Sequence, residues 1–472
     1  MAAGDSESFR SHSEYPAMPG LNRSLAMPQD EVGVYHCFNR CVQQAFLCGF
    51  DREHNVDYSH REVWMREKLR RLARAFAVDV FKYSLMGNHL HLLLRNRPDL
   101  VAEWTDEELA RRWWEVCPER VEPNGMAAEP KPLELAHWLS DPDMMRELRS
   151  RLSNPSWLMR IWCGHIGRRA NQETGKSGRF FEERFKSVRL LDEAAVLACA
   201  LYIDLNPIRA CLAETPEQSE YTSVHDRIAG RKQRLARAQS QRLDVAALTQ
   251  NGGLALDVSC ADPSDADAWL SRLTLDTEQR LNGHLAEWFD GAEAIEWEDL
   301  EEDEPDVVEE FGAPLLAAEP TSHGEPNAVC ESVEQRDPTA ADGTLGETSD
   351  RNASVEGSTR PRRSSNLSGL IHFPAPRASN KGFLSLTFDE YLELLDWTGR
   401  QMHPGKRGAI PESAPPILER LGIHTEGWLK LIDKMRHWRG VAVGHIQRLE
   451  KEAARVGRNW LWRRREMADA FG

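Results

Sequence analysis

The stretch Gly87-Asn-His-Leu-His-Leu-Leu-Leu94 constrains the fold of this chain more than any other part of the sequence. Side chains of a β-strand alternate between faces, so His89 and His91 would share one face of a strand. Two strand residues rise about 6.6 Å, which lets two imidazoles converge on one cation. The glycine and asparagine before them are typical of a hairpin turn. The pattern predicts either a pair of metal ligands or a structural couple of histidines on a buried strand.

A second segment, residues 192–210, predicts a helix with a tyrosine near its end. Asp192 is expected as the N-cap of an alanine- and leucine-rich run. Tyr202 and Asn206 are four residues apart, so they would share one helix face. Pro207 disfavours the helical conformation at Asn206, and the helix is therefore expected to end or kink there. Taken alone, the segment also fits an ordinary core helix.

Ordered motifs along the chain resemble those of the HUH single-tyrosine transposases, most closely the REP-associated tyrosine transposase group. The resemblance covers about residues 28–230. Family members usually carry proline where this chain has Gly87, a change that affects the turn and leaves the histidines intact. The matching segments are YHCFNR at 35–40, LMGNHLH at 85–91, GRFFEERFKS at 178–187, YIDLNPIRA at 202–210 and YTSV at 221–224.

The resemblance implies an α+β fold, namely a ferredoxin-like HUH nuclease/transposase domain with an insertion at about residues 96–143. It implies that Tyr202 is the nucleophile, and that His89, His91 and Asn206 hold a divalent cation. The family works with Mg²⁺ or Mn²⁺, and imidazole ligands suit Mn²⁺ better. The implied reaction cleaves and rejoins single-stranded or hairpin DNA through a 5′-phosphotyrosine intermediate. A bacterial, cytoplasmic and nucleoid-associated protein is expected, with a homodimer as one expected state and no membrane partner.

Two other functions stay open. One is a domesticated relative that binds hairpin DNA without cutting it, and the other is a metal-dependent hydrolase of nucleic acid that uses water. The presence of His89, His91 and Tyr202 together argues against the first. Retained cleavage without a covalent tyrosine adduct would favour the second.

The net charge of −16 argues at first against a nucleic-acid partner, but its distribution reverses that inference. Residues 291–350 hold 19 acidic residues and 1 basic residue, which leaves the rest of the chain at +2. Residues 144–191 hold 11 Lys/Arg against 4 Asp/Glu. Aromatic residues interleave with these charges, as suits phosphates and unpaired bases, although a solvated face has the same composition. The predicted DNA contacts are Arg40, Arg168, Arg169, Arg179, Arg184, Lys186, Arg189 and Arg209.

Shifts in composition divide the chain into five parts. We expect a flexible leader at residues 1–27, the HUH domain at 28–230, a charged helical extension at 231–290, an acidic disordered linker at 291–380 and a basic helical C-terminal module at 381–472. The linker is too poor in apolar residues to fold. Within the HUH domain and just beyond it, strands are expected at residues 32–40, 79–86, 89–95 and 184–191, and helices at 61–78, 144–172 and 226–244.

The basic end of the chain holds 15 Lys/Arg against 8 Asp/Glu after Gly399. Arg463, Arg464 and Arg465 beside two tryptophans fit either a nucleic-acid contact or the solvated end of a helix. The N-terminus lacks an apolar run suited to a signal peptide or a membrane span. The nine cysteines are scattered without paired spacing, which indicates reduced thiols in a cytosolic protein.

Overall fold

The computed structural model describes residues 23–42, 46–51, 54–123, 125–250, 254–275, 381–402, 425–435, 440–458 and 461. Within these residues the protein is α+β, with one mixed five-stranded sheet covered by helices. No helix in the described ranges is both long and apolar enough to cross a bilayer. The cysteines that the structure describes are all free thiols. The acidic linker predicted for 291–380 lies outside the described residues.

The central sheet has the strand order β4-β5-β1-β6-β7. β1 lies in the middle, antiparallel to β5 and β6, and its register sets Phe38 opposite both His91 and Lys186. The four strands expected from the sequence and the hairpin between the second and third are confirmed. Their bounds are β1 Val34–Arg40, β4 Val78–Leu85, β5 His89–Asn96 and β6 Lys186–Leu190. A separate two-stranded sheet pairs β2 Phe50–Asp51 with β3 Val56–Asp57.

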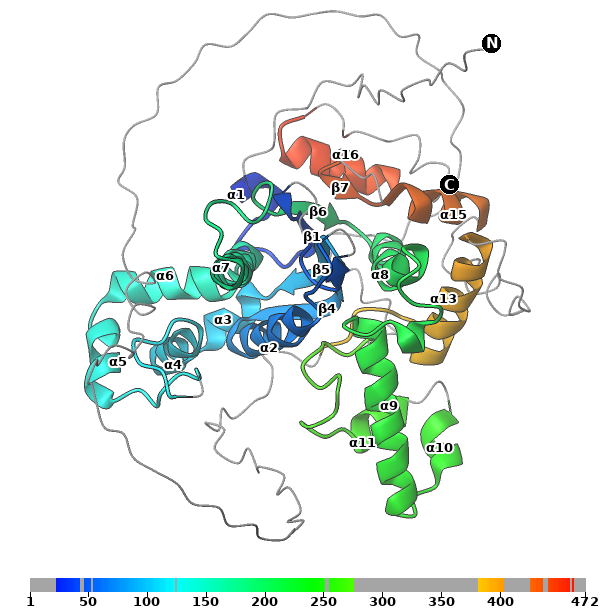
Figure 1. Ribbon diagram of the computed structural model, residues 1–472, viewed down its shortest axis with the longest axis horizontal. Coiled ribbons are helices and arrows are strands. Elements are labelled where there is room, and N and C mark those ends of the chain that lie inside the picture. The colour runs from blue at the N-terminus through cyan, green and yellow to red at the C-terminus, as the bar shows by residue number, and fades with distance from the viewer. Residues whose placement is uncertain are drawn as a thin grey trace, which may run out of the picture.

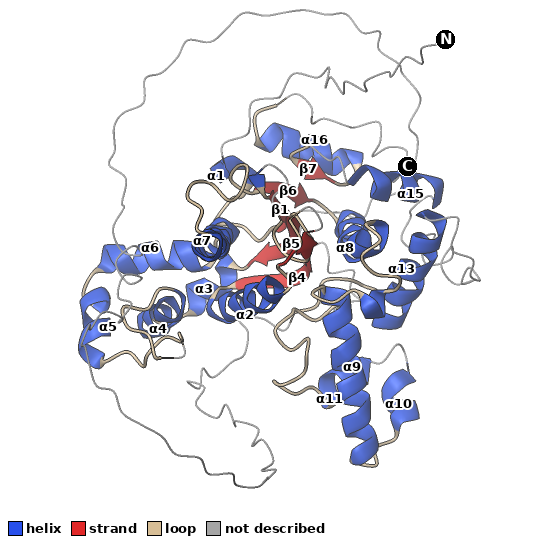
Figure 2. Cartoon of the chain, in the orientation of Figure 1, coloured by secondary structure: helices blue, strands red, loops and turns tan. Residues whose placement is uncertain are grey.

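Helices cover both faces of the sheet (Figure 1, Figure 2). α2 His60–Ala75 and α7 Pro155–Thr174 pack on one face, where Leu69 and Trp162 are fully buried. α8 Glu193–Arg209 packs on the other face. Apart from α1, the β2–β3 pair and the helices between β5 and α7, the chain therefore runs strand, helix, strand, strand, helix, strand before it enters the tyrosine-bearing helix.

The insertion predicted at about residues 96–143 is a lobe of short helices beside α2. Trp113 and Trp114 fill its core, because α4 directs its apolar side toward α2 and α5. Proline stands in the first turn of α3, α5 and α6, where its missing N–H is not needed. The helices are α3 Pro98–Glu103, α4 Asp106–Val116, α5 Pro132–Leu139 and α6 Pro142–Leu152.

The tyrosine helix begins as the sequence predicted but does not end where it predicted. Asp192 caps α8, and its side chain accepts a hydrogen bond from the backbone N–H of Ala195. The helix does not stop at Asn206, because Pro207 lies inside it and helical structure continues to Arg209. Packing of the buried helix on the sheet outweighs the local preference of the residue before proline.

Two predicted boundaries are wrong. Residues 23–26 of the expected leader form the short helix α1 Arg23–Ala26, and Met27 is buried against the domain. The boundary at residue 230 falls inside one continuous helix, α9 Ser223–Ser240. α9 is followed by α10 Val245–Thr249 and α11 Leu254–Ser259. A 3₁₀ turn, η2 Pro216–Gln218, lies between α8 and α9.

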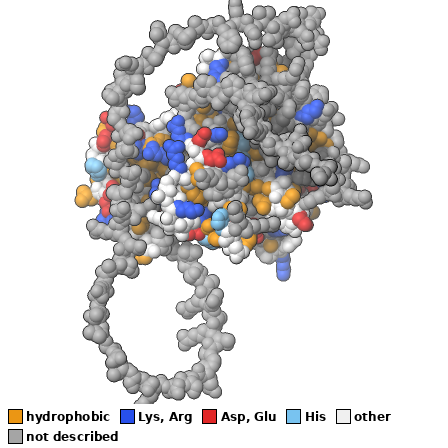
Figure 3. Space-filling model, turned by 45° about the horizontal axis from the view of Figure 1, so that its top comes forward, with side chains coloured by type: hydrophobic (Ala, Val, Ile, Leu, Met, Phe, Trp, Pro, Cys, Tyr) orange, Lys and Arg blue, Asp and Glu red, His pale blue; other side chains and the backbone are white. Residues whose placement is uncertain are grey.

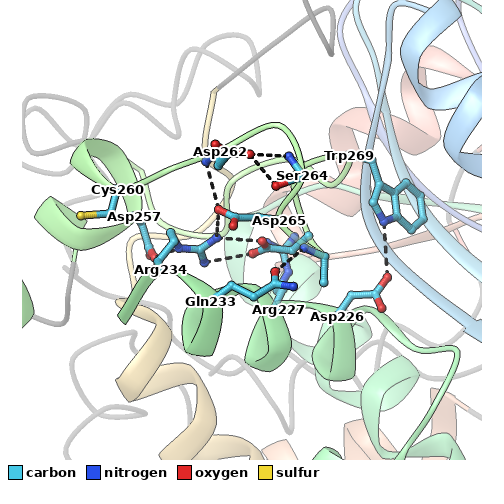
Figure 4. Close-up of polar contacts among 12 residues, drawn as sticks. Asp226, Arg227, Gln233, Arg234, Asp257, Cys260, Asp262, Ser264, Asp265 and Trp269 are labelled. Carbon is cyan, nitrogen blue, oxygen red and sulfur yellow. Dashed lines mark hydrogen bonds and ion pairs between the residues drawn. The ribbon is translucent and has the colours of Figure 1, made fainter. Parts of the chain in front are cut away.

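Arginines of α9 are paired with carboxylates of the segment that follows the helix (Figure 4). Arg234 donates to Asp257 at 3.0 Å and to Asp267 at 2.8 and 3.1 Å. The next turn of the helix contributes Arg237, which binds Asp265 at 2.6 Å. These pairs hold residues 254–270 against α9, so this part of the predicted extension folds back onto the domain.

The C-terminal residues belong to the same core as the tyrosine helix. β7 Ala442–Val443 pairs in parallel with β6 and becomes the edge of the central sheet. α13 Phe388–Met402 and α15 Thr425–Met435 pack on α8, and Trp428 is fully buried there. α16 Ile446–Arg455 follows β7. The described part of 381–472 is thus helical as predicted, but it is not a separate module. The predicted contacts Arg463 to Arg465 lie outside the described residues.

Residues 273–275 and 383–384, which flank residues 276–380, are hydrogen-bonded to each other. Leu275 donates its backbone N–H to Leu384 at 2.8 Å, and Phe383 donates to Leu273 at 3.0 Å. Residues 273–275 and 383–384 therefore lie together in the described structure, although more than a hundred residues separate them in sequence.

Replacing residues 277–380 by a short Gly/Ser linker is expected to keep the fold and to raise the free energy of unfolding by up to about 2 kcal/mol, because closing a shorter loop costs less entropy. Urea unfolding monitored by tryptophan fluorescence measures the change. Truncation before Phe383 is the contrasting variant, and it is expected to abolish cooperative unfolding because it removes buried core. A truncated chain as stable as the full one would contradict this account.

Candidate active site

The start of β5 carries both histidines of the predicted pair on the face that α8 covers. The ring centroids of His89 and His91 are 5.0 Å apart and the rings are perpendicular. That separation is compatible with one cation about 2.1 Å from a nitrogen of each ring. The leucines at 90, 92 and 94 are fully buried on the opposite face, in the core formed with α2 and α7. The prediction that strand alternation places His89 and His91 on one face of the sheet is therefore confirmed.

α8 brings Tyr202 edge-on against these imidazoles. The Tyr202 ring centroid lies 5.5 Å from that of His91, with the planes at 89°. Arg209, two turns later, has its Cζ 5.7 Å from the Tyr202 ring centroid. Asn206 lies between them in sequence, one turn beyond Tyr202. The Tyr202 side chain is buried, with 4% of its surface exposed.

His36 is a site residue that the sequence reasoning missed. Its Nε2 and the Nδ1 of His91 are 2.9 Å apart and share one hydrogen bond. Its ring also lies edge-on to Tyr202, with centroids 6.0 Å apart. The signal was present, because His36 is in the YHCFNR motif and alternates in phase with Phe38, which pairs with His91. What the sequence lacked was the register between β1 and β5.

All three imidazoles are neutral near pH 7. Burial lowers the pKa of His36 to about 3. Burial, with the charge of Arg40, lowers the pKa of His89 to about 4. The pKa of His91 is held well below its usual range, first by burial and then by His89, His36 and Arg40. Neutral imidazoles keep a lone pair for a metal, whereas protonated ones do not.

The residues present fit a bound cation in three respects. Asn88 Oδ1 lies 2.7 Å from His89 Nδ1, which leaves Nε2 of that ring for a ligand. The Nε2 atom of His91 is buried and has no hydrogen-bond partner among the described residues. The same holds for Asn206 Nδ2, and a half-turn of the amide would set its oxygen there instead. No group of three or more His, Cys, Asp or Glu suited to a metal occurs in the described ranges, so the ligand set would be two imidazoles and an amide.

The predicted DNA contacts divide between the two faces of the sheet. Register sets Arg40 opposite His89 and Lys186 opposite Phe38, so these exposed cations stand at the histidine face. Arg168 and Arg169 are on α7, which covers the other face, and Arg169 stacks on Trp64. On the face drawn in Figure 3, Lys and Arg side chains gather with a few acidic ones among them. Arg179 and Arg184 are exposed in the segment between α7 and β6.

Arg189, also predicted as a DNA contact, is paired with carboxylates of the protein itself. Its guanidinium lies 2.9 Å from Glu31 and 3.3 Å from Glu452, and its side chain is only 12% exposed. It binds carboxylates of the N-terminal segment and of α16, so its charge is already matched inside the fold.

A fully buried ion pair joins the tyrosine-bearing helix to β4. Lys82 Nζ on β4 is 2.7 Å from Asp204 Oδ2 on α8. Burial lowers the pKa of Lys82 to about 8, against the opposing effect of Asp204, so the ammonium is still protonated at neutral pH. Neither residue was singled out from the sequence.

Lys82→Met is expected to lower the free energy of unfolding by about 3 kcal/mol, because it leaves the Asp204 carboxylate buried without its cation. The matched control is Lys186→Met at an exposed position of β6, which should change the free energy of unfolding by less than about 0.5 kcal/mol. Urea denaturation at neutral pH measures both. Equal unfolding midpoints for the two variants would contradict the prediction that Lys82 stabilises the fold by neutralising Asp204.

Comparisons with protein-family models, with curated proteins and with solved structures find no match to this chain.

Proposed function

We propose that this protein is a transposase that cleaves and rejoins single-stranded or hairpin DNA through a 5′-phosphotyrosine intermediate. The observation that carries the proposal is the edge-on contact of Tyr202 with His91, 5.5 Å between ring centroids, from segments 111 residues apart. A tyrosine beside neutral histidines with an orphan nitrogen has the parts needed to cut a phosphodiester by covalent catalysis.

The proposed domain is the ferredoxin-like HUH fold. It is supported by the strand, helix, strand, strand, helix, strand order and by the sheet order of β4, β5, β1 and β6. A helical lobe between β5 and α7 is the insertion in that fold.

In the proposed reaction the Tyr202 oxygen attacks phosphorus. The tyrosine–phosphorus bond forms as the bond from phosphorus to the 3′ oxygen breaks; tyrosine gives up its proton, and the 3′ oxygen takes one to leave as a hydroxyl. Attack by another strand's 3′ hydroxyl reverses the step and rejoins DNA. His89, His91 and Asn206 would hold Mg²⁺ or Mn²⁺, which when bound supplies Lewis-acid stabilisation of a non-bridging oxygen. Arg209, Arg40 and Lys186 provide positive charge for phosphates near the tyrosine.

One observation favours a second candidate, a protein that binds hairpin DNA without cutting it. Tyr202 is 4% exposed, as a core side chain would be, so DNA cleavage requires that the site open. A protein that binds hairpin DNA without cutting it does not need to expose Tyr202.

The test uses the full-length protein with Mn²⁺ and a hairpin taken from the DNA that flanks its coding region. The strand is labelled at its 3′ end in one reaction and at its 5′ end in another. A transposase of this kind links only the 3′-labelled fragment to protein on a denaturing gel, and it releases the 5′-labelled fragment free. Two free fragments would instead indicate a hydrolase, and a shifted but uncut hairpin would indicate the non-catalytic binder.

A further inference from the structure

The carboxylate two residues after the tyrosine is a fully buried meeting point of four chain segments. Asp204 accepts a hydrogen bond from Lys82 Nζ at 2.7 Å and another from Ser223 Oγ at 2.8 Å. A third comes from the hydroxyl of Tyr391 at 2.6 Å. All four residues are fully buried. Asp204 therefore ties α8 to β4, to the start of α9 and to the C-terminal helix α13.

Tyr391 is the most distant of these partners, 187 residues beyond Asp204 in sequence. It also packs against the cation, because Lys82 Nζ lies 4.0 Å from its ring centroid. Burial raises the pKa of Tyr391 well above its usual range, so the hydroxyl keeps its proton and remains a donor. Further along the same helix, Gly399 also approaches Leu205 of α8.

The three hydrogen bonds to Asp204 fix one side of α8 to its neighbours. Successive residues of an α-helix point about 100° apart, so Tyr202 and Asp204 point in directions about 200° apart. An anchor at Asp204 thus sets the direction of Tyr202 on the other side. A rotation of about 10° would move a group about 5–6 Å from the axis by about 1 Å. Misplacement by about 1 Å can lower a reaction rate by about a hundredfold.

We propose that Tyr391 is a positioning residue for the nucleophile, acting through Asp204 to hold Tyr202 against His91 and His36. This inference rests on the proposed function where its test measures adduct formation. The part tested by hydrogen exchange in α8 does not depend on that function. The inference assigns the C-terminal segment a part in the reaction, since that segment supplies a donor to the helix that carries the tyrosine.

The chain offers a matched control in Tyr83. Its hydroxyl also donates to a buried carboxylate, Asp226 at 2.8 Å, and both residues are buried. Tyr83 lies in the core on the α2 face of the sheet, away from Tyr202. Tyr391→Phe and Tyr83→Phe therefore each remove one buried hydroxyl and one tyrosine–aspartate hydrogen bond, but only the first removes a hydrogen bond made directly to the tyrosine helix.

The experiment measures adduct formation on saturating hairpin DNA, DNA affinity, and amide hydrogen exchange across residues 200–206, all with the full chain. Tyr391→Phe is expected to slow adduct formation about tenfold or more with unchanged DNA affinity, and to speed exchange in α8. Tyr83→Phe is expected to change neither. Ser223→Ala removes another donor to the same carboxylate. It should also slow adduct formation and speed exchange in α8, so it tests the anchor if Tyr391→Phe folds poorly.

Equal slowing by Tyr391→Phe and Tyr83→Phe would overturn the positioning role, because the effect would then be a general loss of stability. Wild-type rate and wild-type exchange in both Tyr391→Phe and Ser223→Ala would overturn it as well. If the wild-type protein forms no adduct, the proposed function fails and exchange alone decides. Faster exchange in residues 200–206 for Tyr391→Phe alone supports the anchor, and equal exchange in both tyrosine variants overturns it.

Discussion

Tyr202→Phe is expected to abolish the covalent protein–DNA adduct, with a loss of at least about a thousandfold. The substitution removes the attacking oxygen and keeps the ring that packs on His91 and His36. Folding and DNA affinity should therefore stay close to those of the wild type. Adduct formation is followed on a denaturing gel with 3′-labelled hairpin DNA, and affinity is followed by a native gel shift at the same salt concentration.

Tyr35→Phe is the control for a buried tyrosine on the sheet itself. Its hydroxyl has no hydrogen-bond partner among the described residues, and its ring lies in the core on the face away from Tyr202. It should form adduct at the wild-type rate. Equal adduct from Tyr202→Phe and the wild type would remove Tyr202 as the nucleophile.

His89→Ala and His91→Ala are each expected to remove cleavage that depends on a divalent cation, because one imidazole and one amide hold the ion poorly. His36→Ala should cost less, about 10- to 100-fold, since His36 contacts His91 rather than serving as a predicted ligand. Chelator should reproduce the two larger losses, and Mn²⁺ should restore the wild type at least as well as Mg²⁺. Binding of Mn²⁺ measured by calorimetry gives a readout that does not require cleavage.

His137→Ala supplies the comparison for these variants, because His137 is exposed on α5, far from the site in sequence. It should bind Mn²⁺ and cut DNA as the wild type does. Unaltered Mn²⁺ affinity in His89→Ala or His91→Ala would make the pair structural, which is the alternative that strand alternation alone left open.

Local rules predicted the parts of the site that lie close together in sequence. Alternation along a strand predicted that His89 and His91 share a face, and the N-cap rule predicted where α8 begins. The Gly-Asn turn predicted the hairpin between β4 and β5. These features depend on a few neighbouring residues, so the chain encodes them within short windows. The same rules failed at Pro207, where a local conformational preference opposed the burial of a whole helix.

Tertiary structure alone decided which distant groups meet. The register of β1 on β5 brings His36 to His91, and nothing within either strand specifies that register. Arg189 lies in a basic segment of the sequence that predicted phosphate contacts. In the structure it forms ion pairs with Glu31 and Glu452, which come from opposite ends of the chain.

The sequence by itself determined the repeating apolar pattern, the helix cap, the turn and the places of β1, β4, β5 and β6 along the chain. Only the fold decided that the C-terminal residues share a core with the tyrosine helix and that Tyr391 donates to Asp204. The physical reason is that a buried carboxylate is stable only when a cation and hydrogen-bond donors surround it. These partners can come from any segment that packs nearby, however distant in sequence. The segments that return here are separated by more than a hundred residues, a distance over which no local pattern in the sequence extends.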